Sequence, residues 1–146
     1  MGVKIVRNAR ASWSGTVPDG GGRLALGSGA FEGAYSFGTR FENAPGTNPE
    51  ELIAAAHAAC FSMAFAAGLS QAGFVPRSVE TTATVHLDKG AGGFAIAGID
   101  LATRADVPGI SEELFRKTAE DAKAGCPVSK ALAAVPIKLQ LDLGGH

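Results

Sequence analysis

Hydrophobic and polar residues alternate along several segments of the chain, a pattern typical of strands with one buried face. The clearest alternation runs over 79–87, and after the loop sequence DKGAGG a second apolar segment extends over 94–105. These two segments predict a β-hairpin. Weaker patterns predict further strands within 3–13, at 24–26 after the breaker PDGGG, at 34–38 and over 137–143.

The segment that follows residue 47 has the pattern of a helix N-terminus. Asn48 is a favourable N-cap residue and Pro49 suits the first helical position, while Glu50 and Glu51 lie at the positive end of the helix dipole. The run 52–69 carries no formal charge and is apolar on nearly every face. This pattern predicts a buried core helix, in which the many alanines let neighbouring elements approach closely.

The apolar run also approaches the shortest length that spans a bilayer. It begins beside two carboxylates and contains His57 and Ser62, so we expect a core helix of a soluble protein with no membrane partner. Residues 1–10 lack the apolar core and the cleavage site of a signal peptide. We therefore expect a cytoplasmic location.

Two further helices are predicted after residue 108. Ser111 is a candidate N-cap for an amphipathic helix that ends near Gly125, and a short helix is predicted to begin at Cys126 and Pro127. Blocks of strands and helices joined by hairpins predict an α+β fold, with antiparallel β-sheets packed around the buried central helix. The length of 146 residues predicts one domain, 1–146.

The charge and the cysteine count limit the possible functions. Thirteen Lys and Arg against fourteen Asp and Glu give a net charge of −1, which does not favour capture of nucleic acid or of an anionic membrane. Small molecules or proteins are the expected partners. Two cysteines cannot form a disulfide framework, so the simplest interpretation is two buried free thiols.

Cys60 lies about three turns into the predicted central helix, among alanine and phenylalanine side chains. Burial there raises the pKa of a thiol, whereas the reactive species is the thiolate. A reactive Cys60 therefore requires a cation from elsewhere in the fold. Arg40, in a predicted loop after the third strand, is the candidate, although a surface arginine is the ordinary alternative.

Glu50 is the candidate partner for that guanidinium, because Glu51 already fits the N3 position of a capping box. A solvated first-turn acid is the alternative. Ten helical residues separate Glu50 from Cys60 by roughly 15 Å along the axis. A site that uses both residues needs either an Arg40 that spans much of this gap or a Glu50 from a second copy of the helix.

Cys126 precedes a proline and is placed like an N-cap residue, where the helix dipole and free N–H groups lower the pKa of a thiol. If Cys126 lies near Cys60, a sulfenic acid on Cys60 can condense with it to a disulfide. The residues alone also leave three other interpretations open. These are a His57–Cys60 dyad as in thiol hydrolases, a three-ligand zinc site, and a non-catalytic module that binds an apolar ligand with both cysteines as packing.

Four long motifs in the same order resemble the OsmC branch of the OsmC/Ohr peroxidase family. They are TRFE at 39–42, GTNPEELIAAAHAACFSMA at 46–64, SVETTATVHLDK at 78–89 and AGCPVSKAL at 124–132. The sequence AHAAC is similar to the OsmC branch, whereas a tyrosine commonly replaces the histidine in the organic hydroperoxide resistance branch. The resemblance covers nearly the whole chain.

The resemblance implies an intertwined homodimer with paired central helices and two active sites at the subunit interface. It implies that Cys60 is the peroxidatic cysteine, Cys126 the resolving one, Arg40 the thiolate-stabilising arginine and Glu50 its partner. It further implies a preference for organic hydroperoxides over hydrogen peroxide and re-reduction by a dithiol or a lipoylated protein. No metal, flavin or haem cofactor is implied.

Overall fold

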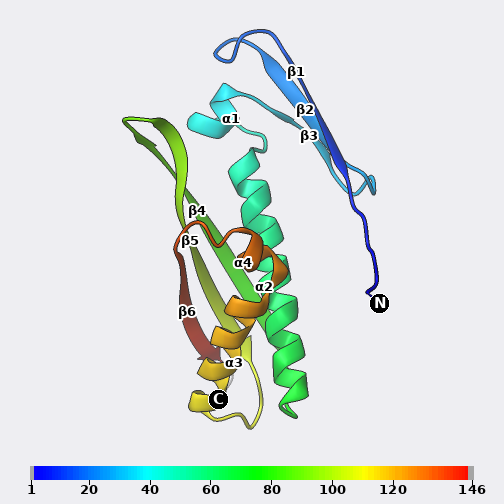
Figure 1. Cartoon of the computed structure of the whole chain (residues 1–146), viewed down its shortest axis with the longest axis vertical. Coiled ribbons are helices and arrows are strands. Elements are labelled where there is room, and N and C mark those ends of the chain that lie inside the picture. Colours follow the sequence, from blue (N-terminus) through cyan, green and yellow to red (C-terminus); the bar gives the residue numbers. More distant parts are fainter. Residues whose placement is uncertain (1, 145–146) are drawn as a thin grey trace. The chain divides into compact units, whose positions relative to one another are not determined.

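The computed structural model describes residues 2–144. The chain divides into two compact units, Met1–Pro49 and Glu50–His146, and each contains one three-stranded sheet (Figure 1).

The first unit is an antiparallel sheet followed by one short helix. Its strands β1 (Ala9–Ser14), β2 (Gly21–Leu26) and β3 (Glu32–Tyr35) pair in sequence order, which confirms the predicted strands in outline. Gly20 closes the β1–β2 loop, where a Cβ atom would collide with the backbone carbonyls of Ser14 and Thr16. A larger residue at that position cannot keep this tight turn.

The third strand ends earlier than predicted, because a helix begins where the loop was expected. Ser36 and Thr39 form a reciprocal capping box at the start of α1 (Phe37–Phe41), in which each side chain accepts a hydrogen bond from the backbone N–H of the other. Arg40 therefore lies in a short helix. The prediction that Arg40 belongs to a loop is wrong.

The second unit begins within the first turn of the long helix α2 (Pro49–Gln71), which starts at the predicted proline. At its other end Gly73 adopts a φ of 93°, and the N–H of Phe74 donates to the carbonyl of Leu69 over 2.9 Å. This is a Schellman-type end, which requires a residue with positive φ at the position of Gly73. Both helix ends therefore follow from local sequence.

The sheet of the second unit contains the predicted hairpin. Strands β4 (Ser78–Gly90) and β5 (Gly93–Asp106) are antiparallel and are joined by a two-residue turn at 91–92. The helices α3 (Glu112–Gly125) and α4 (Pro127–Ala131) then precede β6 (Ile137–Gly144), which pairs with β5 in parallel. The expectation of a wholly antiparallel sheet is therefore wrong for β6. The two helices form a crossover that returns the chain to the other end of the sheet before β6 begins.

The core of the second unit forms where α2 packs against this sheet and against α3 (Figure 1). Phe61, Phe65 and Leu69 follow one face of α2 and are fully buried, and the Phe65 ring meets the edge of Phe115 at a centroid distance of 5.3 Å. Full burial of each such side chain stabilises the fold by roughly 2 kcal/mol. Cys126 belongs to the same core, so packing fixes the start of α4 beside α2.

The opposite face of α2 is apolar but exposed within the single chain. Ala55, Ala59, Met63 and Ala67 follow this face, and Met63 is 76% exposed. By length and composition α2 is apolar enough to cross a membrane, with a mean hydropathy of 1.8 over its most apolar stretch. Three buried side chains pack α2 against a sheet, as in a core helix. The central position of this helix was predicted, but within the single chain only one of its faces is covered.

Candidate active site

The two cysteines lie side by side although they are far apart in the sequence. The Sγ atoms of Cys60 on α2 and Cys126 at the start of α4 are 2.8 Å apart, and both thiols are free. Cys60 is partly exposed, whereas Cys126 is fully buried. A disulfide needs a sulfur separation of about 2.05 Å, so a small movement would join the pair.

The backbone at the α3–α4 junction explains how Cys126 reaches this position. Its N–H still donates to the carbonyl of Ala122 at the end of α3, while its φ of −59° and ψ of 126° take the chain out of the helix. Pro127 then occupies the first turn of α4. Cys126 is therefore the N-cap of α4, as predicted, and its side chain enters the core at the corner between two helices.

The pKa of the Cys126 thiol lies below its usual value. Burial acts to raise this pKa, but interactions with Cys60, with the backbone and hydroxyl of Ser129 and with the backbone of Val128 together lower it. The sulfur makes no capping hydrogen bond of regular geometry among the described residues, so these groups act on it mainly as oriented dipoles. The environment favours a thiolate at Cys126.

The pKa of the Cys60 thiol is shifted in the opposite direction. Burial raises it most, and the hydrogen bond with Cys126 raises it further, while the backbone of Val128 acts weakly in the other direction. These groups carry no positive charge. A nucleophilic Cys60 therefore needs a cation in addition to these neighbours.

The other two predicted site residues lie on different elements. Glu50 is in the first turn of α2, is 8% exposed and belongs to the same unit as both cysteines. Arg40 belongs to the first unit, where its guanidinium lies 5.3 Å from the centre of the Phe41 ring. Of the four predicted site residues, Cys60 and Cys126 are the two that the structure brings into contact within one unit.

Arg40 also borders a small cavity of about 170 Å³ in the first unit. Aromatic side chains dominate its lining, which consists of Trp13, Val17, Tyr35, Ser36, Phe37, Arg40 and Phe41. An arginine beside aromatic surface combines a hydrogen-bond donor with an apolar wall. The cavity therefore suits a small ligand with one polar end and one apolar end.

Sequence reasoning missed Ser129. This residue is 4% exposed in α4, and its Oγ lies 2.7 Å from Nε2 of the fully buried His57 on α2. The other ring nitrogen of His57, Nδ1, has no hydrogen-bond partner within residues 2–144. His57 therefore pairs with Ser129, and the Cys60–His57 dyad of a thiol hydrolase is not formed. The one available signal was the position of Ser129, three residues after a cysteine N-cap.

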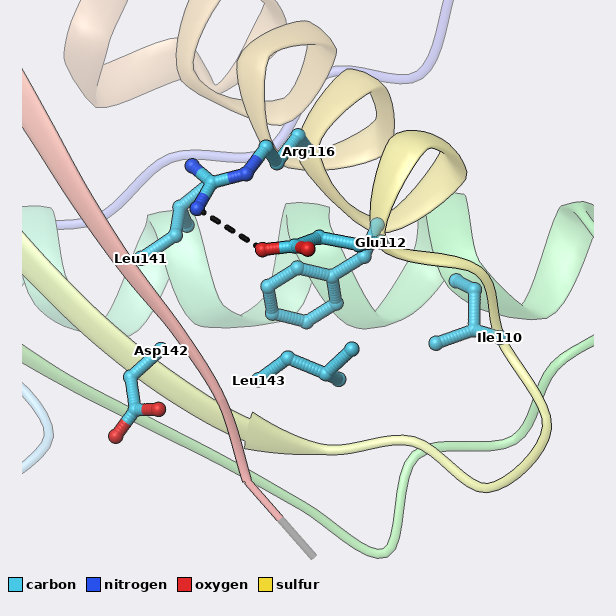
Figure 2. A pocket seen from close by; sticks show the side chains of 7 residues that line it. Ile110, Glu112, Arg116, Leu141, Asp142 and Leu143 are labelled. Atoms are coloured by element: carbon cyan, nitrogen blue, oxygen red, sulfur yellow. Dashed lines mark hydrogen bonds and ion pairs between the residues drawn. The ribbon is translucent and has the colours of Figure 1, made fainter. Parts of the chain in front are cut away.

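Two further features are distinct from the cysteine pair. In the described part of the chain, no group of three or more His, Cys, Asp or Glu side chains is arranged to hold a metal ion. A larger cavity of about 480 Å³ lies between α3 and β6, with an ion pair of 3.2 Å between Glu112 and Arg116 at its edge (Figure 2). The described residues that line it include no cysteine or histidine.

The buried His57 predicts a pH dependence of stability. Burial lowers its pKa from the usual value of 6.5, so below about pH 6.5 the unfolded chain binds a proton that the folded protein resists. The free energy of unfolding should therefore be unaffected by His57 above this pH and fall as the pH decreases further. Urea unfolding at several pH values measures the slope. His57→Gln should flatten it; a slope that this substitution leaves unchanged would contradict the assignment.

Comparison with known proteins gives consistent matches over this fold. A family model described as "OsmC-like protein" matches residues 41–141. The chain is 50% identical over 133 residues to Peroxiredoxin OsmC of Escherichia coli, covering 90% of this chain and 93% of the relative. It is 37% identical over 87 residues to an organic hydroperoxide resistance protein of Xanthomonas axonopodis, covering 59% of each chain.

A solved structure agrees with the fold as well. The organic hydroperoxide resistance protein OhrB of Bacillus subtilis superposes with a TM-score of 0.74 and 27% identity, covering 92% of this chain and 98% of its own. The α+β arrangement of two small sheets and helices is therefore that of these proteins.

Proposed function

Because this chain belongs to the OsmC-like protein family, we propose that it is a cysteine-based peroxidase that reduces organic hydroperoxides, with Cys60 and Cys126 as its redox pair. The observation that carries the proposal is the 2.8 Å separation of two free thiols that have different degrees of burial. The names of the relatives, a peroxiredoxin and an organic hydroperoxide resistance protein, support the reaction class.

The chemistry proceeds in two steps. The Cys60 thiolate attacks the distal oxygen of the hydroperoxide; the O–O bond breaks, and the alkoxide leaves and takes a proton to become an alcohol. Cys60 is now a sulfenic acid. The Cys126 thiolate then attacks the Cys60 sulfur; the S–O bond breaks, hydroxide leaves as water after protonation, and a disulfide forms. A dithiol, such as a lipoylated protein, returns both cysteines to thiols and completes the cycle.

Arg40 is proposed as the cation that lowers the pKa of Cys60 and stabilises the departing alkoxide, and Glu50 as the carboxylate that holds its guanidinium. Burial and the neighbouring Cys126 raise the pKa of Cys60, so an additional cation is needed to stabilise its thiolate. The planar guanidinium stays charged and donates several hydrogen bonds in a fixed arrangement, which suits this task.

Replacing Arg40 tests this role. Arg40→Met should lower the second-order rate of Cys60 oxidation by roughly 10²-fold, because it removes both the thiolate stabilisation and the donor to the leaving oxygen. Arg40→Lys should recover part of the rate, since it keeps the charge without the fork geometry. Stopped-flow oxidation measures both. Arg23→Met, which removes a surface ion pair in the same unit, is the control; equal effects at the two positions would contradict the role.

The aromatic cavity beside Arg40 supports a preference for organic hydroperoxides, because an apolar group can be buried there while hydrogen peroxide has none to bury. Cumene hydroperoxide should therefore oxidise the protein faster than hydrogen peroxide. Trp13→Ala should reduce the rate with cumene hydroperoxide and leave the rate with hydrogen peroxide nearly unchanged. Equal rates with the two peroxides in the unaltered protein would contradict the substrate class.

A homodimer is also proposed, in which the exposed apolar face of α2 packs against a second copy and residues 1–146 act as one domain. The exposed Ala55, Ala59, Met63 and Ala67 support this, since small side chains permit close helix packing. We place the protein in the reducing cytoplasm, where free thiols persist. Light scattering at micromolar concentration tests the dimer, and a monomeric mass would contradict it.

A further inference from the structure

A buried hydrogen bond between His57 and Ser129 lies close to the cysteine pair. His57 on α2 is fully buried, Ser129 on α4 is almost fully buried, and their polar atoms lie 2.7 Å apart. Ser129 is also the residue whose backbone and hydroxyl act on the Cys126 sulfur. Ser129 is the third residue of α4, one turn after the N-cap Cys126, so the buried His57–Ser129 contact lies next to the cysteine pair.

The surroundings of the imidazole determine where its proton lies. Burial lowers the pKa of His57, so the ring is neutral and carries one N–H. Nε2 faces Ser129 Oγ, whereas Nδ1 is buried without a hydrogen-bond partner among residues 2–144. A buried N–H without an acceptor is costly, so the proton belongs on Nε2, which donates to Ser129. The Ser129 oxygen is then an acceptor, and its own hydrogen is available to another group.

We propose that His57 is a positioning residue for the resolving step: by donating from Nε2 to Ser129 Oγ, it directs the Ser129 hydroxyl hydrogen to the Cys126 sulfur and stabilises the Cys126 thiolate. This inference rests on the proposed peroxidase function, in which Cys126 attacks the sulfenic acid of Cys60. His57 never touches the reacting atoms and transfers no proton itself. It acts through the orientation of one hydroxyl group.

The orientation matters because a serine hydroxyl has a single hydrogen. Without a donor on its other side, that hydrogen is free to turn to Nε2 or to a backbone carbonyl of the preceding turn, and the sulfur then loses a donor. A hydrogen bond to a charged group is about twice as strong as one between neutral groups, so its loss disfavours the thiolate. The proton released by Cys126 goes to solvent. The attack of the Cys126 thiolate on the Cys60 sulfenic acid proceeds as described above.

The thiolate of Cys126 can be measured directly in Cys60→Ser, which leaves Cys126 as the only cysteine. The ultraviolet absorbance of the thiolate, followed against pH, gives the titration midpoint of a buried sulfur without the need for a reagent to reach it. In this background Ser129→Ala should raise the midpoint by about one pH unit, the loss expected for one hydrogen bond to a charge. His57→Leu should raise it by a similar amount.

Three comparisons separate positioning from general packing. In His57→Gln the amide can donate in place of the ring, so the midpoint should lie close to that of the protein with His57. His57→Leu added to Ser129→Ala should cause no further shift, because His57 acts only through Ser129. The control Ser62→Ala removes a hydrogen bond of 2.8 Å from α2 to Thr81 and should leave the midpoint unchanged. Circular dichroism confirms that each variant is folded; if His57→Leu or Ser129→Ala fails to fold, His57→Met or Ser129→Gly, which also removes the polar group, takes its place.

The reaction gives a second readout in variants that retain both cysteines. After one equivalent of peroxide, conversion of the sulfenic acid to the disulfide should be roughly threefold slower in Ser129→Ala and in His57→Leu. A tenfold smaller thiolate fraction is partly offset by the higher nucleophilicity of a more basic thiol. The rate of sulfenic acid formation should not fall. An effect on that first step alone would contradict the proposal.

The midpoint experiment uses no peroxide, so its outcome does not depend on whether the protein is a peroxidase. An unchanged midpoint in Ser129→Ala, or a shift from His57→Leu that is as large in the Ser129→Ala background as alone, would overturn the role of His57. Those results would leave the proposed peroxidase function intact. Absence of any peroxide-driven oxidation, together with the predicted midpoint shifts, would instead contradict the function and retain the role of His57.

Discussion

Replacing Cys60 with serine is expected to abolish peroxide consumption, with a loss of at least ~10³-fold. A serine hydroxyl is not ionised near neutral pH, and an alcohol does not take up the distal oxygen of a peroxide, so no sulfenic acid forms. The measurement is the consumption of cumene hydroperoxide in the presence of dithiothreitol.

The matched control is Ser62→Ala, which changes the same helix two residues away and removes its hydrogen bond to Thr81. This variant should retain nearly full peroxide consumption. Full activity in Cys60→Ser would end the proposal. If both thiols also resisted modification in the folded protein, the chain would instead be a non-catalytic module with the cysteines as packing.

Cys126→Ser is expected to leave the first step intact and to block the second. One equivalent of hydroperoxide should be reduced, and the protein should then hold Cys60 as a sulfenic acid, one oxygen heavier than the thiol form. Steady-state turnover should fall by about tenfold or more, because an external thiol must replace a neighbour whose sulfur lies 2.8 Å away.

Intact mass after a single addition of hydroperoxide measures this outcome, and a dione reagent that is specific for sulfenic acid identifies the trapped group. Excess hydroperoxide should carry Cys60 on to the sulfinic acid more readily than in the unaltered protein. Full turnover with no trapped oxygen in Cys126→Ser would show that Cys126 is not the resolving residue.

Local sequence predicted those elements whose ends are determined by neighbouring residues. Pro49 starts α2, Ser111 caps α3 and Cys126 begins α4, each as expected from capping preferences. The hairpin of β4 and β5 followed from strict alternation. In contrast, the strand predicted to extend to 38 ends before α1, because the capping box of Ser36 and Thr39 starts a helix there.

Other features depend on contacts between distant segments, and the sequence pattern could not reveal them. The alternation in β6 predicts a strand but not its direction, which is set by the helical crossover after β5. The contact of His57 with Ser129 depends on the packing of α4 against α2. No local preference encodes such a pairing.

The electrostatics of the cysteine pair could be predicted in direction only. Burial of Cys60 raises its pKa, and the position of Cys126 at a helix start lowers its own, as expected from their places in the sequence. The helix terminus is not the whole cause at Cys126. Interactions with Cys60 and with the Ser129 hydroxyl contribute, and these arise from the tertiary fold.

The central claim is that Cys60 and Cys126 form a disulfide when the protein reduces an organic hydroperoxide. The most direct test adds one equivalent of cumene hydroperoxide to the reduced protein, measures the intact mass and maps the bonded peptides. We expect a loss of two hydrogens and a single bond between Cys60 and Cys126 within one chain. An unchanged mass, or a bond that joins two chains, would contradict it.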